Sequence, residues 1–338
     1  MNKMIKKVAA IALSAVMIGG CFAGCSAGAK DDSKAENKDT YKVGILQLVQ
    51  HEALDKATDG FKDKLTELMK EAGKTVEFDY QNASGDSAAC PTIANQFVSN
   101  KVDLIMANAT ASLQASATAT AASKIPVVGT SITDFGVALD IEMGSTDATG
   151  INVTGSNDLA PLDKQAEQIT TLFPKAKKIG CLYCSAEPNS KFQVEGIKEA
   201  LTAKNIDCEF YSFTDTNDIQ AVAKEAASKS DVIYIPTDNT AASNGAVISA
   251  ACKEAKTPII AGEDGIFKKT EAVATLSISF YEIGQKAGEM AFDILVNGKD
   301  PSTMNIWQTS NVKAYYNDDM AKMYNVTIPD GYEVLKAE

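Results

Sequence analysis

Apolar and polar positions repeat along the chain as short buried runs that each end in polar residues. In residues 231–243 the run VIYI stops at a proline and opens into the polar cluster TDNT. Residues 103–112 read DLIMANATAS in the same way, and KIPVVGTSITD at 124–134 parallels KTPIIAGEDG at 256–265. A strand, a polar turn, a helix and a second strand therefore occur twice, about 130 residues apart. This repetition predicts two similar α/β lobes.

Alternation and helical spacing extend each copy into a βα series. The first series has expected strands at 41–48, 75–80, 102–106 and 127–128, and expected helices at 52–71, 87–100 and 111–123. The second has expected strands at 178–183, 207–213, 231–235, 258–261 and 274–279, and expected helices at 159–173, 192–204, 218–229 and 241–255. This order predicts two Rossmann-like lobes with parallel sheets and right-handed crossovers.

The remaining segments predict that the chain changes lobes more than once. Residues 150–157, GINVTGSN, have the composition of a loop and are expected to leave the first lobe. The later elements are too few for a third domain, namely a helix at 281–296, strands at 305–308 and 313–316, and a helix at 318–324. The expected division is 41–152 plus 280–310 for the N-terminal lobe and 153–279 plus 311–338 for the C-terminal lobe, with a hinge built from several segments.

Residues 1–25 have the pattern of a secretory signal. Three lysines precede an apolar run at 8–18, which is too short for a comfortable membrane span. Small residues then lead to Cys21 and Cys25, an arrangement that resembles a bacterial lipobox. Cys25 is the preferred lipidation site because polar sequence follows it directly, with Cys21 as the alternative; an ordinary signal with incidental cysteines is also possible. Residues 26–40 are expected to be a solvated tether.

Composition narrows the class of partner. The chain has 338 residues, is 45% hydrophobic and 22% charged, and carries a formal net charge of −12. These are the values of a globular protein, and the acidic surface argues against binding to nucleic acid or electrostatic adhesion to anionic lipid. A lipid anchor is therefore the expected membrane contact, and we expect a monomer.

The cysteines of the body do not indicate a disulfide framework or a metal site. They are an odd set at irregular spacing: Cys90, Cys181, Cys184, Cys208 and Cys252. Cys181 and Cys184 form a CxxC inside an apolar strand, where residues three apart point to opposite faces. We therefore expect buried structural thiols and no metal.

Catalytic chemistry has little material in this sequence. His51 is the single histidine, and the chain has no HExxH, no GxSxG, no Walker motif and no GxGxxG after a strand. The sequence therefore predicts a protein that is not an enzyme and that needs no cofactor.

Polar residues at the predicted strand ends supply the chemistry of a binding site. Because strand ends of parallel sheets meet at one edge, these side chains are expected to face a cleft between the lobes. The candidates are Gln47, His51, Thr110, Ser112, Asp134, Glu187, Asn189, Ser190, Thr237, Asp238, Asn239 and Asp264. Several of them could instead cap helices.

This mixture of polar groups suits a zwitterionic amino acid. Hydroxyls at helix starts suit a carboxylate, and a desolvated carboxylate suits an ammonium. Thr110 with Ser112, or Asn189 with Ser190, would hold the carboxylate. Asp238 or Asp134 would hold the ammonium. Three aromatic residues near the strand ends would form an apolar wall of the ligand site or pack in the core: Phe135, Tyr183 and Tyr281.

Several motifs resemble one known family. They are YKVGILQLVQHEALDKATDGFKDKL from residue 41, DYQNASGD, VDLIMANAT, IPVVGTSITD, GINVTGSND, KKIGCLYCSAEPNS and DVIYIPTDNT. In this order and spacing they resemble the substrate-binding lipoproteins of ABC transporters, in particular the branch associated with tryptophan and tyrosine uptake. The similarity extends from about residue 41 to the end of the chain.

The resemblance implies a type I periplasmic-binding-protein-like fold with three crossovers and a ligand enclosed between the lobes. It implies a lipid-anchored receptor outside the cytoplasm that delivers an aromatic amino acid to a permease with an ATPase. The cleft positions implied are Gln47, His51, Thr110, Asp134, Glu187, Asn189, Ser190, Thr237, Asp238, Asn239 and Asp264. The chain departs from the family at Phe135, where proline is common, and this change is expected to alter the side-chain pocket.

Two alternatives remain at this stage. A nucleoside or sugar ligand would require stacking aromatic residues on both cleft walls. A surface adhesin or sensor without transport would use the same fold without a transporter.

Overall fold

The computed structural model describes residues 38–143 and 146–336, all within one unit, Ala35–Glu338. The predicted signal segment, both lipidation candidates Cys21 and Cys25, and nearly all of the tether lie outside the described residues. Within the described ranges, no helix combines the length and hydropathy that crossing a bilayer requires.

The first sheet has five parallel strands in the order β2-β1-β3-β4-β5. Its strands are β1 (Thr40–Gln47), β2 (Thr75–Asn82), β3 (Leu104–Asn108), β4 (Val127–Ile132) and β5 (Val153–Asn157). Its helices are α1 (Glu52–Glu71), η1 (Ser87–Ala89), α2 (Cys90–Ser99), α3 (Thr110–Thr120), α4 (Phe135–Leu139) and α11 (Phe280–Leu295). We call this sheet and its helices the first lobe.

The second sheet has seven strands in the order β12-β11-β10-β9-β8-β6-β7, and only the β10–β11 pair is antiparallel. Its strands are β6 (Lys178–Cys184), β7 (Asp207–Phe213), β8 (Val232–Ile235), β9 (Ile259–Ala261), β10 (Ala274–Ser277), β11 (Lys313–Tyr316) and β12 (Glu333–Val334). Its helices are α5 (Leu162–Leu172), α6 (Pro188–Thr202), α7 (Ile219–Lys229), α8 (Asn239–Ser243), α9 (Gly245–Ala255), α10 (Asp264–Thr270) and α12 (Asp318–Met323). We call these elements the second lobe.

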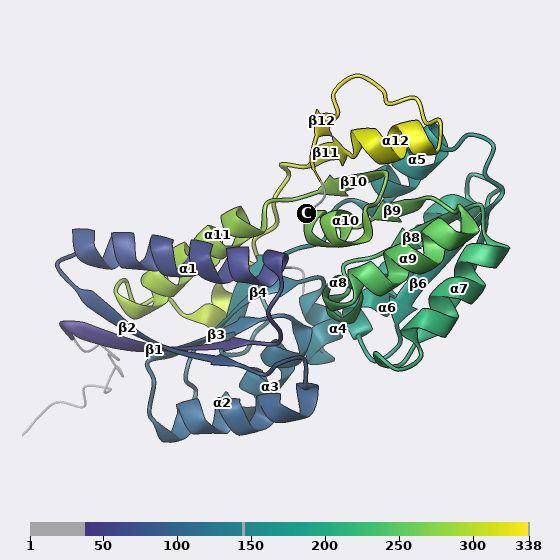
Figure 1. The fold of residues 1–338 in the computed structure, drawn as a ribbon. Helices are drawn as coiled ribbons and strands as arrows, with labels where there is room; N and C mark the ends of the chain where they lie inside the picture. Colours follow the sequence, from purple (N-terminus) through teal and green to yellow (C-terminus); the bar gives the residue numbers. More distant parts are fainter. Residues whose placement is uncertain (1–37, 144–145, 337–338) are drawn as a thin grey trace, which may run out of the picture. The chain divides into compact units, whose positions relative to one another are not determined.

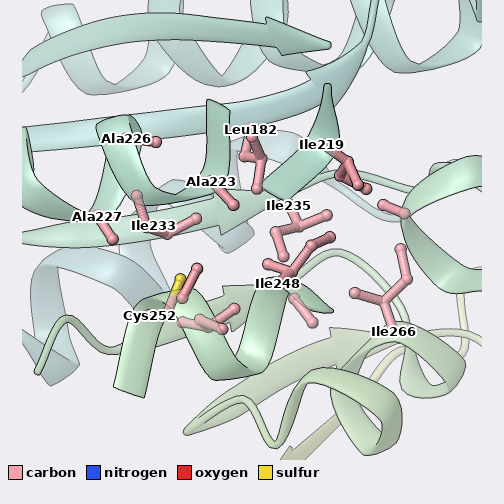
Figure 2. Packing of buried hydrophobic residues seen from close by; sticks show 14 of the residues in the cluster. Leu182, Ile219, Ala223, Ala226, Ala227, Ile233, Ile235, Ile248, Cys252 and Ile266 are labelled. Atoms are coloured by element: carbon pink, nitrogen blue, oxygen red, sulfur yellow. The ribbon is translucent and has the colours of Figure 1, made fainter. Parts of the chain in front are cut away.

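Helices cover both faces of each sheet, which explains why central strands such as β3 and β4 are buried along their whole length. In the first lobe, α1 and α11 lie side by side on one face and α2 and α3 cover the other (Figure 1). In the second lobe, α7, α9 and α10 cover one face and α5 and α6 the other. Figure 2 shows the side chains of Leu182, Ile219, Ile235 and Ile248 meeting in the core beneath α7, α9 and α10.

Helices α1 and α11 pack unusually closely because glycines lie at their contact. A Cβ atom on Gly284 would lie 2.0 Å from the carbonyl oxygen of Ala57, and one on Gly60 would lie 2.2 Å from that of Tyr281. Each glycine therefore gives the opposite backbone room to approach.

Within the described residues, the chain passes between the lobes three times. Residues 158–161 lead from β5 to α5, residues 278–279 lead from β10 to α11, and residues 308–312 lead to β11. Before the third passage, η2 (Pro301–Thr303) follows α11, and Trp307 forms a parallel bridge with Ser156 beside the first sheet. Residues 305–308 were predicted as a strand, and only isolated bridges occur there.

The predicted exit from the first lobe was placed too early. Residues 153–157 are not a loop but strand β5, which pairs with β4, so the first sheet extends to Asn157 rather than ending at residue 152. The expected helix at 241–255 is divided into α8 and α9, and helices α4 and α10 were not predicted. Cys181 and Cys184 point into different cores, as the CxxC spacing inside a strand predicted.

Candidate functional site

A cavity with a volume of about 510 Å³ lies between the two lobes. From the first lobe it is lined by the loops that follow β1 and β2 and by the start of α3. From the second lobe it is lined by the segments that follow β6, β7 and β8. The lining residues are Leu48, Val49, Ser84, Gly85, Ser87, Thr110, Ala111, Gln114, Cys184, Ala186, Glu187, Pro188, Asn189, Thr214, Asp215, Thr216, Asn239, Thr240, Ser243 and Asn244.

The start of α3 lies on the first-lobe wall of the cavity. No side chain of the described residues caps this helix, because its N-cap position is occupied by Ala109, whose φ of +88° is strained for a residue with a Cβ. Thr110 and Ala111, the first two residues of the helix, line the cavity. The uncapped backbone N–H groups and the positive end of the helix dipole therefore favour a negative group there.

Glu187 provides a carboxylate on the opposite wall. Its oxygens accept hydrogen bonds from the backbone N–H groups of Asn239 (3.0 Å) and Thr240 (2.9 Å). They also accept from the Asn239 amide (2.7 Å), the Thr240 hydroxyl (2.8 Å) and the Asn189 amide (3.3 Å). All of these donors are neutral, so they fix the carboxylate in place without neutralising its charge.

The charged residues of the described cavity lining are all acidic. Glu187 and Asp215 are both acidic, and none of the described lining residues is Lys, Arg or His. A ligand that brings its own cation would therefore balance the charge of the wall.

Asp238, a predicted ammonium ligand, does not line the cavity and is turned into the second lobe. Its Oδ1 accepts from the backbone N–H of Ala241 (2.8 Å), which caps α8, and its Oδ2 accepts from that of Cys184 (2.6 Å). The residue is 1% exposed, and burial together with the charge of Glu187 raises its pKa to about 8. Its observed contacts are structural.

His51 lies at the edge between the lobes. Its Nε2 donates to the Asn239 side-chain oxygen across the interface (3.1 Å), while its buried Nδ1 has no hydrogen-bond partner in the described part of the chain. Burial lowers its pKa below 6.5, so the imidazole is neutral at pH 7. His51 therefore contacts Asn239, which in turn holds Glu187.

The other predicted site residues lie outside the cavity lining, and most are held by contacts within one lobe. Gln47 is buried and hydrogen-bonds to Val49, Asp55 and Thr58, while Ser112 is also fully buried. Asp134 caps α4, and Asp264 lies beside two lysines. The side chain of Ser190 donates to the carbonyl oxygen of Thr237 (3.2 Å).

The three aromatic residues predicted to form an apolar wall are not among the described residues that line the cavity. Tyr183 packs edge-on against Phe210, with ring centroids 5.9 Å apart. Phe135 is buried in the core of the first lobe, and the hydroxyl of Tyr281 donates to Asp63. Phe135 therefore does not reshape the cavity by direct contact, contrary to our expectation.

Thr110, Glu187, Asn189 and Asn239 are the predicted site residues that do line the cavity. Two lining loops were missed, residues 84–87 after β2 and residues 214–216 after β7. Both are polar clusters at strand ends, so the rule used for the other strands would have found them.

A buried hinge carboxylate gives one pH-dependent prediction. Asp158, in the first crossover, is 3% exposed and accepts a hydrogen bond from Thr133 (2.9 Å). Burial raises its pKa from 3.8 to about 6. Because the folded pKa is the higher one, the contribution of Asp158 to stability is present below pH 4 and is lost as the pH rises through 6.

We therefore expect Asp158→Asn, which is neutral at every pH, to raise the free energy of unfolding at pH 8 by about 1–3 kcal/mol. At pH 4 the substitution should change the free energy of unfolding little. Thermal unfolding at both pH values checks this, with Asp140→Asn at an exposed position as the control. An equal effect of Asp158→Asn at pH 4 and pH 8 would contradict the expectation.

Comparisons with known proteins agree on one family. The family model described as ABC transporter substrate binding protein matches residues 42–338. A curated relative, the tyrosine-binding protein of Clostridioides difficile strain R20291, is 34% identical over 325 residues, which cover 94% of this chain and 92% of the relative.

Two solved structures are similar over most of the chain. One is an ABC domain from Streptococcus pneumonia in complex with L-Trp, with a TM-score of 0.81 and 32% identity over 88% of this chain and 100% of that chain. The other is the ligand-free, open structure of a substrate binding protein with adhesive properties from Clostridium difficile. Its TM-score is 0.66 and its identity 34%, over 88% of this chain and 100% of that chain.

Proposed function

Because the chain belongs to the family of ABC transporter substrate-binding proteins, we propose that it captures a free aromatic amino acid between its lobes and delivers it to a permease. The observation that carries this proposal is the pairing of the uncapped start of α3 with the acidic wall around Glu187. A zwitterion satisfies both surfaces at once, with its carboxylate at α3 and its ammonium near Glu187.

In this proposal the backbone N–H groups at the start of α3 and the Thr110 hydroxyl hold the carboxylate. Glu187, fixed by Asn189 and Asn239, takes the ammonium role that the sequence had suggested for Asp238 or Asp134. The ring would lie against the small apolar residues of the lining, which include Leu48, Val49 and Pro188. The tyrosine and tryptophan binding of the relatives supports an aromatic side chain.

The described cavity lining contains no Phe, Tyr or Trp. A nucleoside or a sugar usually stacks on aromatic walls, so the lining favours a zwitterion over either of these ligands.

We infer that the structure is the closed form of the receptor. At nearly equal sequence identity, its similarity to the tryptophan complex (TM-score 0.81) exceeds its similarity to the ligand-free, open structure (0.66). Direct contacts between the lobes, such as His51 with Asn239, are consistent with closure. Ligand contacts from both lobes would shift the population toward this form.

The family works on the extracytoplasmic side of the membrane. Our proposal includes lipid anchoring at Cys25, with Cys21 as the alternative, a monomeric receptor and no catalytic activity. The support for the anchor is the sequence pattern of residues 1–25.

A thermal-shift screen of the purified protein, refolded from denaturant to remove any carried ligand, tests the proposal. We expect a selective rise in the melting temperature with L-tyrosine, L-tryptophan or L-phenylalanine, because a ligand that binds only the folded form stabilises it. A rise only with nucleosides or sugars would overturn the ligand class. No rise with any of these compounds would favour the adhesin alternative, which the adhesive relative suggests.

A further inference from the structure

A group of four charged residues joins the lobes outside the cavity lining. Glu52 and Lys56 lie in the first turns of α1, and Asp264 and Lys268 lie on α10 of the second lobe. Lys268 forms an ion pair with Glu52, and Lys56 lies 3.4 Å from Asp264. Each lobe thus supplies one carboxylate and one ammonium, and both ion pairs cross between the lobes.

These charges are only partly exposed. The exposed fraction of the side chain is 18% for Glu52, 17% for Asp264 and 12% for Lys268, whereas Lys56 is 40% exposed. Although burial lowers the pKa of Lys56, its carboxylate partners raise it above its ordinary value. Partial burial reduces solvent screening, so these pairs are expected to exceed ordinary surface pairs in strength.

Each carboxylate of this group also has a lysine partner on its own helix. Glu52 pairs with Lys56, and Asp264 lies 3.9 Å from Lys268, both at i,i+4 with the acid on the N-terminal side, the favourable order on a helix. When the lobes separate, each carboxylate can therefore keep the lysine of its own helix. The electrostatic cost of opening is limited to the loss of the cross-lobe partners.

We propose that Glu52, Lys56, Asp264 and Lys268 form an electrostatic latch that stabilises the closed form and slows ligand release. None of the four lines the ligand cavity, so the latch acts on the lobe equilibrium rather than on the ligand. Its effect on ligand release rests on the proposed receptor function, whereas its effect on the lobe arrangement does not.

Charge reversal tests the latch. Lys268→Glu would surround Lys56 with three carboxylates and should favour the open form. Adding Glu52→Lys leaves two positive charges on α1 facing two negative charges on α10, which should restore or strengthen closure. The matched control is Lys322→Glu, which also breaks an i,i+4 pair in the second lobe, with Asp318, at a side chain that is 70% exposed.

The first measurement is small-angle X-ray scattering of the ligand-free protein. We expect a larger radius of gyration for Lys268→Glu and a return to the wild-type value for the double variant, with no change for the control. Raising the ionic strength should reduce the difference, because salt screens such pairs. Circular dichroism verifies folding, and if Lys268→Glu fails to fold, the double variant alone must match or exceed wild-type compactness.

The second measurement is the stopped-flow dissociation rate of L-tyrosine. It should be about tenfold faster in Lys268→Glu, since losing a partner of a close charge pair acts mainly on dissociation. It should recover in the double variant. Equal radii and equal dissociation rates in all variants would overturn the latch. Absence of tyrosine binding in every protein would overturn the proposed ligand, and the scattering data would still decide the latch.

Discussion

Glu187→Gln should weaken the binding of L-tyrosine by at least thirtyfold, or about 2 kcal/mol. The substitution removes the charge that the ammonium would face in a cavity wall whose described residues include no basic side chain. It also places an amide nitrogen where every neighbour within hydrogen-bond distance donates, including the backbone N–H groups of Asn239 and Thr240. Both effects act in the same direction.

Isothermal titration calorimetry with two ligands separates a binding role from a structural one. The second ligand is 3-(4-hydroxyphenyl)propionate, which lacks the ammonium of tyrosine. If Glu187 binds the ammonium, Glu187→Gln should weaken tyrosine binding far more than binding of this analogue. Equal losses for both ligands would mean that Glu187 only holds α8.

Asp215→Asn is the matched control for Glu187→Gln. It removes the same charge from the same cavity, but Asp215 is exposed, so solvent screens it. We expect less than a threefold change in affinity, in keeping with the small energies of exposed charges.

Gly284→Ala should lower the free energy of unfolding by about 2 kcal/mol or more. Helix propensity alone would favour alanine by about 1 kcal/mol. The added methyl group, however, would lie 2.0 Å from the carbonyl oxygen of Ala57. This carbonyl belongs to the backbone of α1, so it cannot move aside as a flexible side chain could. Helices α1 and α11 would have to separate, which loosens the core that both helices cover.

Gly196→Ala is the control, since it adds the same methyl group to the interior of another helix. There the Cβ would meet only the far end of the Leu162 side chain, at 2.5 Å, and that side chain can change rotamer. Urea unfolding should show little change for Gly196→Ala. If Gly284→Ala proved as stable as this control, the close contact between α1 and α11 would not be the reason that residue 284 is glycine.

Much of the fold could be predicted from the sequence because apolar runs and polar strand ends alternate clearly. The α/β class with two lobes of mainly parallel strands is confirmed, as is membership of the substrate-binding family. Strand β5 was missed because its sequence, VTGSN, has loop composition. The glycine in this sequence, Gly155, is needed because a Cβ atom there would lie 2.1 Å from the carbonyl oxygen of Gly129 on the neighbouring strand. A glycine required for packing was therefore interpreted as a sign of a turn.

The sequence predicted that the site lies at the strand ends, but not which of the side chains there face the cavity. Asp238 and Glu187 follow neighbouring strands and are both acidic, yet one caps α8 from inside the lobe and the other faces the cavity. Sequence patterns do not encode this difference, because residues that cap helices are also residues that bind ligands. Asp264 was likewise predicted as a ligand contact, while its observed partners are two lysines.

The position of α11 in the chain affects how the protein is made. This helix covers β1 of the first lobe, yet it follows nearly the whole second lobe in the sequence. A nascent chain that emerges N-terminus first cannot shield Ile45 or Phe61 until residues 280–295 arrive, and the second sheet similarly waits for β11 and β12. The first core is completed only once residues 280–295 have been made and the second sheet only once residues 313–334 have been made, so stable folding of either lobe waits for segments distant in the sequence.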